Sequence, residues 1–368
     1  MRLSASSLSL VLWVAGSAPV TGCKQAPKAS SPAPAIALLL PESQAARYEI
    51  ADRPFFESKF HELCPGVEVM AWNANQVAAD QQQQAQAAIA RGVKLVVLDP
   101  VDGELAGAIV NDAKARAIPV VSYDRVVRGG ALPDYHVGYD HERSGKLAAE
   151  ALLEKLAALG VAGPKIAMFD GAVTDPGALR FTSGAHAVFE GKATVVKEAV
   201  AARAEDAQPV MAQVIAAAGP GGFDAVFAAS DAATGGAIAA MQAAGIDPAT
   251  RPTIGRDADL AAIQRIVAGE QYATIYGRIQ PEAEKAAELA CALVKGQKPA
   301  AGLITGAVNN GTGDIRSVLL IAAAVSRAGS PLTQPIAVTV VKDRPWGPDS
   351  AARICNGHEA ACTAANIK

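Results

Sequence analysis

The sequence lacks the marks of a nucleic-acid-binding protein, a metalloprotein or an enzyme. Its Lys and Arg residues are scattered and the formal net charge is −3, so the clustered positive charge that holds a polyanion is missing. No Cys/His spacing resembles a metal site, and neither a G-x-S-x-G elbow nor a phosphate-cradling loop occurs. We therefore expect no nucleic-acid partner, no cofactor or metal, and no enzymatic activity.

Long apolar runs are also missing, except near the N-terminus. Residues 8–18 are apolar, follow the single basic residue Arg2 and precede small residues, which predicts a secretory signal peptide over residues 1–22. Residues 20–23, VTGC, resemble a bacterial lipobox, which implies that Cys23 is the lipidated first residue of the mature protein. A secretory peptide without lipidation is the alternative.

The segment that follows the predicted signal peptide is rich in Pro, Ala and Ser. It has no apolar periodicity, so residues 23–35 are interpreted as a lipid-anchored linker. A single anchor of this kind would hold a folded domain at a membrane surface without making it an integral membrane protein. We expect the protein to be periplasmic or extracytoplasmic and membrane-anchored.

Cysteine is scarce, with five residues in the chain. Cys355 and Cys362 lie close together in a loop-rich tail and could form a disulfide in an oxidising compartment. Cys64 and Cys291 fall at or within helical segments, where they could either pair or simply be buried.

From residue 36 onward the pattern alternates between short apolar strands and helices. The strands at residues 36–40, 94–98 and 225–229 are apolar apart from Lys94, which is typical of a parallel sheet covered on both faces. Because 346 residues remain after residue 22 (368 − 22), the chain is too long for one compact core. We predict an α/β fold with two Rossmann-like lobes.

Polar residues follow several of these predicted strands. Asp124-Arg125, Ser230-Asp231 and Arg256-Asp257 each come directly after an apolar run. In open α/β sheets ligands bind beyond the carboxyl ends of the strands, so Asp231 and Asp257 are candidates to face a common cleft. The alternative is that each of these two aspartates only caps the helix that it precedes.

The lobe boundaries are predicted from breaks in the alternation. Gly129-Gly130 and Pro133 interrupt the rhythm, which places the first crossing within residues 126–139; a second follows residues 271–276, and a late strand at 336–341 suggests a third. The predicted division is a first lobe of 36–127 plus 279–302, a second lobe of 128–278 plus 303–345, and a tail of 346–368.

Five segments together carry a family resemblance: YDR at 123–125, GYDHERSG at 138–145, ASDAATGGAI at 229–238, GRDADLAAIQRI at 255–266 and ATIYGRI at 273–279. In this order they resemble the periplasmic sugar-binding proteins of ABC importers, type I, and most of all the xylose-binding branch of the ribose-type group. The resemblance covers nearly the whole mature chain. It implies two lobes joined by three hinge strands that close over a monosaccharide.

The resemblance also implies the ligand-binding residues. It assigns ligand contacts to Arg47, Asp124, Arg125, Asp140, Ser230 and Asp257, to which we add Tyr48, Arg180, Asp231 and Arg278. A carboxylate can accept hydrogen bonds from sugar hydroxyls while an Arg donates to their oxygens. An internal surface ion pair is the alternative interpretation of Asp124-Arg125.

The chain departs from the xylose-binding pattern at several positions. Ser230 stands where the pattern has Asn, Gly277 where it has Lys, and Tyr48 where it has Trp. Residues 197–208 also lack the tryptophan that the pattern supplies for stacking. Arg278 is a candidate to replace the missing Lys charge.

The leading hypothesis is a monomeric lipoprotein that captures a monosaccharide, such as a xylose-like pentose, and delivers it to an ABC permease in the inner membrane. A sugar sensor that presents its closed form to a chemoreceptor or sensor kinase is the alternative. A glycosidase with two aspartates is a third hypothesis, which the number of strand-end carboxylates and arginines without a distinct acid and base disfavours.

Overall fold

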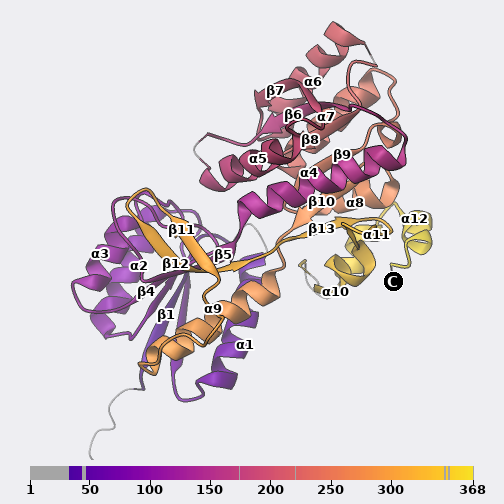
Figure 1. Cartoon of the computed structure of the whole chain (residues 1–368). Helices are drawn as coiled ribbons and strands as arrows, with labels where there is room; N and C mark the ends of the chain where they lie inside the picture. The colour runs from indigo at the N-terminus through magenta and orange to yellow at the C-terminus, as the bar shows by residue number, and fades with distance from the viewer. Residues whose placement is uncertain are drawn as a thin grey trace, which may run out of the picture. The chain divides into compact units, whose positions relative to one another are not determined.

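The computed structural model describes residues 33–43, 47–173, 175–219, 221–343, 345–346 and 349–367. The predicted signal peptide, Cys23 and most of the predicted linker lie outside these residues. Residues 34–368 form one compact unit, shown in Figure 1. Among the helices in the described part of the chain, none has both the length and the hydropathy needed to cross a bilayer.

The first lobe is built on a seven-stranded sheet of order β11-β12-β5-β4-β3-β1-β2. Every neighbouring pair is parallel except the antiparallel hairpin β11–β12. The strands are β1 (Ala35–Leu40), β2 (Glu68–Asn73), β3 (Val96–Leu98), β4 (Val120–Tyr123), β5 (Tyr135–Tyr139), β11 (Gly306–Asn309) and β12 (Asp314–Leu320).

Helices cover both faces of this first sheet. All six residues of β1 are buried, and alternate residues enter different cores: Ile36 and Leu38 in one, Ala37 and Leu39 in the other. This is the pattern of a strand with helices on both sides. The helices on one face are η1 (Tyr48–Asp52), α1 (Arg53–Leu63) and α9 (Ile279–Val294), and on the other α2 (Ala78–Arg91) and α3 (Gly107–Lys114).

The second lobe repeats the design with a seven-stranded sheet of order β14-β13-β10-β9-β8-β6-β7. Its pairs are parallel except β10–β13. The strands are β6 (Lys165–Asp170), β7 (Thr194–Val200), β8 (Ala225–Ala228), β9 (Thr253–Arg256), β10 (Ala273–Tyr276), β13 (Ala323–Ser326) and β14 (Gln334–Pro335).

Three buried clusters pack against the second sheet. One cluster includes α4 (His141–Ala158) and α5 (Pro176–Phe189), another α6 (Ala204–Ala218) and α7 (Asp231–Ala243), and the third α8 (Leu260–Ala268) and the tail. The short η2 (Pro248–Thr250) follows α7, and the tail consists of η3 (Ile336–Val338), α10 (Val340–Asp343), α11 (Ser350–Cys355) and α12 (Glu359–Ala364). Figure 1 shows the tail in yellow beside α8.

Two mostly parallel sheets with helices confirm the predicted two-lobe α/β fold. The predicted boundaries need correction. Residues 135–139 were assigned to the second lobe, but β5 pairs with β4 in the first sheet. The break at Gly129-Gly130 is a crossover inside one sheet that uses a loop where a parallel pair usually has a helix, and the first crossing between lobes follows Tyr139.

The third crossing also differs from its prediction. The segment at 336–341 contains η3 and the start of α10 instead of a strand. The chain returns from the second lobe to the first as α9, adds β11 and β12 to the first sheet, and crosses back between Leu320 and Ala323. Residues 306–320 therefore belong to the first lobe and not, as predicted, to the second.

Both possible cysteine pairs are disulfides. Cys355–Cys362 closes the tail, as the spacing predicted. Cys64 at the end of α1 pairs with Cys291 in α9, with a Cα–Cα distance of 5.9 Å. This second disulfide joins two parts of the first lobe that are separated by 227 residues.

Helices α4 and α5 approach each other so closely that glycine is required at their contact. A Cβ atom at Gly145 would lie 1.9 Å from the Phe181 carbonyl oxygen, and one at Gly184 would lie 2.0 Å from the Glu142 carbonyl oxygen. We expect Gly145→Ala to destabilise the chain by about 1–3 kcal/mol or more, because backbone must move. Chemical denaturation measures this, with Gly66→Ala as the control, since a Cβ there meets nothing within 4 Å; equal effects would contradict the prediction.

Candidate functional site

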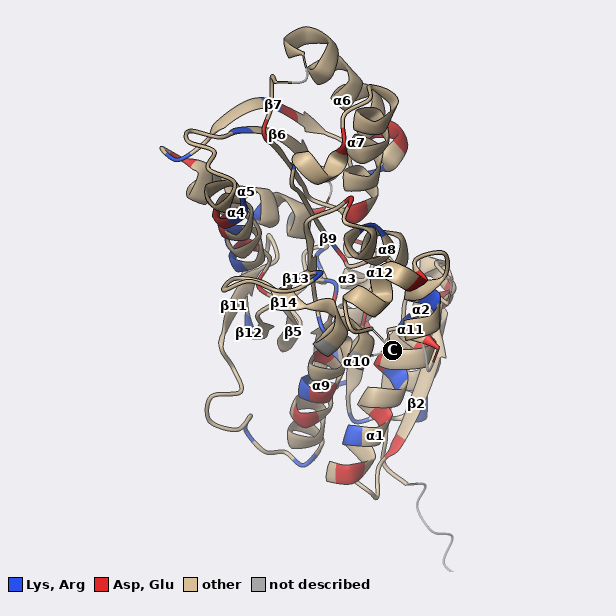
Figure 2. Ribbon diagram, turned by 90° about the vertical axis from the view of Figure 1, so that its right-hand side faces the viewer, with Lys and Arg blue, Asp and Glu red and all other residues tan. Residues whose placement is uncertain are grey.

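Charged residues gather where the strands of the first sheet end. Glu42 follows β1, Asp99 follows β3, and Asp124 and Arg125 follow β4. Because these strands are parallel, their carboxyl ends share one edge of the sheet. Elsewhere acidic and basic residues are spread over both lobes, as Figure 2 shows.

Arg47 connects this edge to η1 and α9. Its guanidinium donates to both carboxylate oxygens of Asp52 at 2.8 and 2.9 Å. It also lies 3.5 Å from the Asp124 carboxylate and 3.6 Å from that of Glu282. Tyr123 donates its hydroxyl to Asp52 as well. One guanidinium is therefore shared among three carboxyl groups.

Arg125 and Tyr48 lie beside Arg47 at the same edge. The Arg125 guanidinium donates to the Tyr48 hydroxyl and to Glu42, each at 3.3 Å. The Tyr48 ring, with 3% of its surface exposed, contacts both guanidiniums, Arg47 at 5.1 Å and Arg125 at 5.9 Å from the ring centroid. Tyr48 thus orients the two arginines and offers little free ring surface for stacking.

Two further carboxyl groups at this edge are buried. Asp99 has none of its surface exposed and Glu282 has 1% exposed. Burial raises the pKa of both carboxyls well above the usual range, and the negative charge of Asp124 raises each further. Both carboxyls therefore hold a proton more readily than an ordinary carboxyl does.

The second lobe presents a comparable pair at the end of β9. Arg256 donates to Asp257 at 3.2 Å and to Asp175 at 3.4 Å, and its guanidinium lies 5.5 Å from the Phe181 ring centroid. Its Nη1 is buried and has no hydrogen-bond partner among the described residues. The guanidinium therefore has an unused donor beside Asp257.

Both strand-end aspartates have an unusual backbone conformation. Asp124 has φ +53° and Asp257 has φ +102°. Residues other than glycine adopt positive φ only at some conformational cost, and such positions occur preferentially at functional sites. This strain is consistent with a role for both side chains in binding.

Neither Asp231 nor Asp257 caps the helix that follows it. Ser230 caps α7 by accepting from the Ala233 amide, and Asp259 caps α8 by accepting from the Ala262 amide. The Ser230 hydroxyl also donates to the Ala202 carbonyl at 2.7 Å. Its donor and one of its two acceptor sites are therefore used within the lobe, and its ligand role stays a prediction.

The prediction for Asp231 requires a correction. Its carboxylate is 1% exposed and accepts from the Gln271 amide, the Thr274 hydroxyl and the Asp259 backbone amide. The strand end turns this side chain into the second lobe, where it ties β8 to β10. Asp231 thus has a structural role. Of the two candidate aspartates at the carboxyl edge of the second sheet, Asp257 is the one that can still face a ligand.

The other predicted ligand residues have different surroundings. Arg278 forms a two-fold ion pair with Asp343 of α10, at 2.8 and 2.6 Å, and its role in place of the missing Lys charge stays a prediction. Arg180 of α5 donates to the Asn309 carbonyl of β11 at 2.9 Å and so joins the two lobes. Asp140 caps α4 through the Arg143 amide and is partly exposed.

His141 lies between the two sets of charged residues. Burial lowers its pKa to about 4, helped by the positive charge of Arg256, while the charge of Asp124 acts in the opposite direction. Groups from both lobes therefore act on the same imidazole at the first crossing.

His136 in β5 makes the stability depend on pH. Burial lowers its pKa to about 4 from an ordinary 6.5, with His141 adding to the effect. Since the unfolded chain binds the proton more readily, stability falls as the pH drops from 6.5 to 4. The loss from His136 amounts to at most roughly 3 kcal/mol. We expect His136→Gln to reduce this loss of stability, which chemical denaturation at pH 7 and pH 4.5 measures. His61→Gln, at an exposed position of α1, is the control and should retain the loss. A His136 variant with the same pH dependence as the native chain would contradict the assignment.

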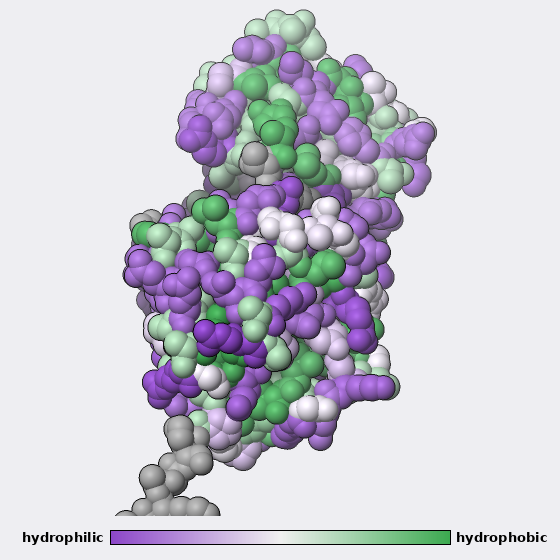
Figure 3. All heavy atoms as spheres, turned by 90° about the vertical axis from the view of Figure 1, so that its left-hand side faces the viewer, coloured by the Kyte–Doolittle hydropathy of each residue, from purple (hydrophilic) through white to green (hydrophobic). Residues whose placement is uncertain are grey.

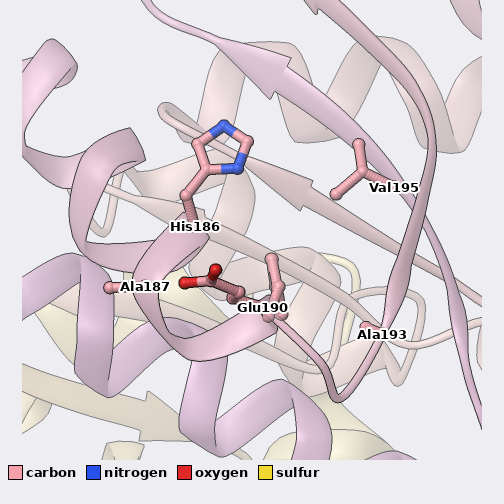
Figure 4. Close-up of a pocket in the computed structure, with 6 residues that line it drawn as sticks. His186, Ala187, Glu190, Ala193 and Val195 are labelled. Atoms are coloured by element: carbon pink, nitrogen blue, oxygen red, sulfur yellow. The ribbon is translucent and has the colours of Figure 1, made fainter.

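A shallow pocket of about 340 Å³ lies elsewhere on the second lobe. It is lined by His186, Glu190 and Val195 among others, at the end of α5 that is distant from Asp175, and Figure 4 shows its residues. His186 contacts Glu198 at 2.8 Å. Within the described residues no group of His, Cys, Asp or Glu is arranged to hold a metal.

Comparison with known proteins identifies the family. Residues 36–298 match the model described as periplasmic binding protein domain. The D-xylose-binding periplasmic protein of Escherichia coli is 33% identical over 299 residues, which is 79% of this chain and 85% of that protein. This chain belongs to the periplasmic binding protein family. The multiple sugar-binding periplasmic protein of Azospirillum brasilense is 27% identical over 72% of this chain and 78% of its own length.

Solved structures confirm the fold of this binding protein. The solute-binding protein of Chloroflexus aurantiacus in complex with D-glucose superposes with a TM-score of 0.68 and 21% identity, covering 86% of this chain and 97% of that one. The periplasmic ribose transporter protein of Conexibacter woesei gives 0.66 and 17%, covering 80% and 92%. The fold is the type I periplasmic binding protein fold, and the relatives are binding proteins, in line with the prediction of no enzymatic activity.

The sequence motifs did not point to every residue of the site. Asp52, Asp99, Asp175, Arg256 and Glu282 were absent from the predicted set. Asp99 and Arg256 do carry the signal used for Asp124, since each stands at the end of an apolar strand. Asp52 and Glu282 lie on helices, where nothing in the local pattern distinguishes a carboxyl that turns inward.

Proposed function

We propose that this binding protein captures a monosaccharide, a xylose-like pentose or a related sugar, and delivers it to an ABC permease. One observation carries the proposal: each lobe presents an adjacent Asp and Arg at the carboxyl end of a strand, Asp124-Arg125 and Arg256-Asp257. Carboxylates that accept and guanidiniums that donate are the groups that recognise sugar hydroxyls. The 33% identity with D-xylose-binding proteins supports this class of ligand.

The proposed binding residues come from both lobes. Closure of two lobes over a polar ligand would surround it with donors and acceptors and exclude water. The set comprises Arg47, Asp124, Arg125 and Asp140 from the first-lobe side, and Arg180, Arg256 and Asp257 from the second.

A thermal-shift screen of the full chain against pentoses, hexoses and polyols tests the proposal. A ligand that binds only the folded state raises the melting temperature by mass action. We expect a rise with one or a few sugars; no response to any sugar at millimolar concentration would overturn the proposal.

We further propose that Cys23 anchors the protein to a membrane in the periplasm. The predicted signal peptide and the lipobox-like VTGC sequence support this. Metabolic labelling with a radioactive fatty acid should mark the native chain and leave Cys23→Ser unlabelled. Equal labelling of both chains would reject lipidation at this residue.

A further inference from the structure

Carboxyl groups outnumber guanidinium groups at the strand ends of the first lobe. The residues concerned are Glu42, Asp52, Asp99, Asp124 and Glu282 against Arg47 and Arg125. The undescribed residues 44–46, Gln-Ala-Ala, add no charge to this count. The first lobe therefore has a deficit of positive charge at its part of the proposed binding site.

The two arginines cannot neutralise all of these groups. Arg47 places two of its donors on Asp52, at 2.8 and 2.9 Å, and approaches Asp124 and Glu282 only at 3.5 and 3.6 Å. Arg125 is directed to Glu42 and Tyr48 and comes no nearer to Asp99 than 4.0 Å. Asp99 and Glu282 are thus the groups with the weakest compensation.

The Asp99 carboxyl lacks hydrogen-bond partners among the described residues. It is fully buried, and neither carboxylate oxygen has a hydrogen-bond partner in the described part of the chain. A buried carboxyl without partners carries a large desolvation cost. Its backbone carbonyl, by contrast, is bonded to the Gln81 amide at 2.8 Å, so the residue itself is held firmly.

Glu282 shows the same feature independently. It lies in the first turn of α9 with 1% of its surface exposed, and its Oε1 has no partner among the described residues. Asp124 acts electrostatically on both Asp99 and Glu282. Two unpartnered carboxyls on different elements therefore flank the same strand end.

We propose that this site selects a monosaccharide bearing a protonated amine, an amino sugar, whose ammonium group is bound by Asp99, Asp124 and Glu282. The inference rests on the proposed function, since the hydroxyl-recognising Asp and Arg pairs supply the rest of the contacts. An ammonium group has three donors and one positive charge, so it could donate to carboxyl oxygens that lack partners and would favour the ionised form of these carboxyls.

Titration calorimetry on the full chain tests this. The probes are pentoses and hexoses, each compared with its amino-deoxy derivatives at every ring position and with the corresponding N-acetyl derivatives, which lack the charge. We expect at least one amino sugar to bind tenfold or more tightly than its parent and its N-acetyl form. A parent sugar that binds as well as all its amino derivatives would overturn the inference and leave the proposed function intact; no binding by either kind would overturn both.

Variants test whether Asp99 and Glu282 cause the preference for an amino sugar over its parent sugar. Asp99→Asn and Glu282→Gln, which preserve shape, should each lower the ratio of amino-sugar to parent-sugar affinity at least tenfold. Asp134→Asn is the matched control, since Asp134 accepts from the Val120 amide where β4 begins, at the opposite edge of the same sheet. An unchanged ratio in both Asp99 and Glu282 variants, with unfolding temperatures showing that they are folded, would reject the role of these carboxyls.

Discussion

Replacing Asp124 by asparagine is expected to raise the dissociation constant for the ligand by 30- to 1000-fold. The substitution removes a charged acceptor from a site that is enclosed when the lobes close. Losing such a contact costs about 2–4 kcal/mol. Asparagine is the substitution of choice because Asp124 has φ +53°, a conformation that asparagine tolerates better than alanine.

The same experiment applies to the second lobe. Asp257→Asn, at φ +102°, should weaken binding by a similar factor, because the proposed site needs both lobes. Asp247→Asn is the control: Asp247 accepts from the Ala249 amide and caps the exposed η2. Calorimetry with the sugar found by the thermal-shift screen measures all three, and native affinity in both Asp124 and Asp257 variants would reject the site.

Removing the Cys64–Cys291 disulfide is expected to have the largest effect on stability. The link closes a loop of 227 residues, and the loss of chain entropy in the unfolded state gives about 5 kcal/mol for a loop of this length. For the seven-residue separation of Cys355–Cys362, the same relation gives about 2–3 kcal/mol. The double substitution Cys64→Ser/Cys291→Ser should therefore be clearly more destabilising than Cys355→Ser/Cys362→Ser.

Denaturant titration followed by tryptophan fluorescence distinguishes the two disulfides. Trp72 lies in β2 of the first lobe and Trp346 in the tail of the second. Loss of Cys64–Cys291 should lower the midpoint of the transition reported by Trp72. If the tail disulfide proved to be the more stabilising of the two, the entropic argument would fail for this chain.

The alternation of short apolar strands with helices was enough to predict two parallel sheets. What the pattern could not supply was sheet membership. β5 follows a glycine-rich loop. The sequence pattern of a loop that connects two strands of one sheet does not differ from that of a loop that leaves the sheet. β11 and β12 pair as an antiparallel hairpin at the edge of the first sheet, although they follow the second lobe in the chain.

The candidate site was predicted best where the backbone alone decides which residues meet. Asp124, Arg125 and Asp257 lie at strand ends as expected. Side-chain direction was not predictable: Asp231 turns into the core toward Thr274, and Arg278 turns to Asp343. Each side-chain direction depends on a partner that is distant in sequence: Thr274 is 43 residues from Asp231, and Asp343 is 65 residues from Arg278.

The return of the chain to the first lobe has a consequence for biogenesis. Strands β1 to β5 come early in synthesis, but α9, β11 and β12 complete the same lobe after the strands β6 to β10 have been made. Cys64 cannot form its native disulfide until Cys291, 227 residues later, has been synthesised. Before these later elements arrive, the first lobe therefore passes through a stage with an uncovered sheet face and an unpaired edge, when protection by a chaperone and correct thiol oxidation would decide the yield of folded protein.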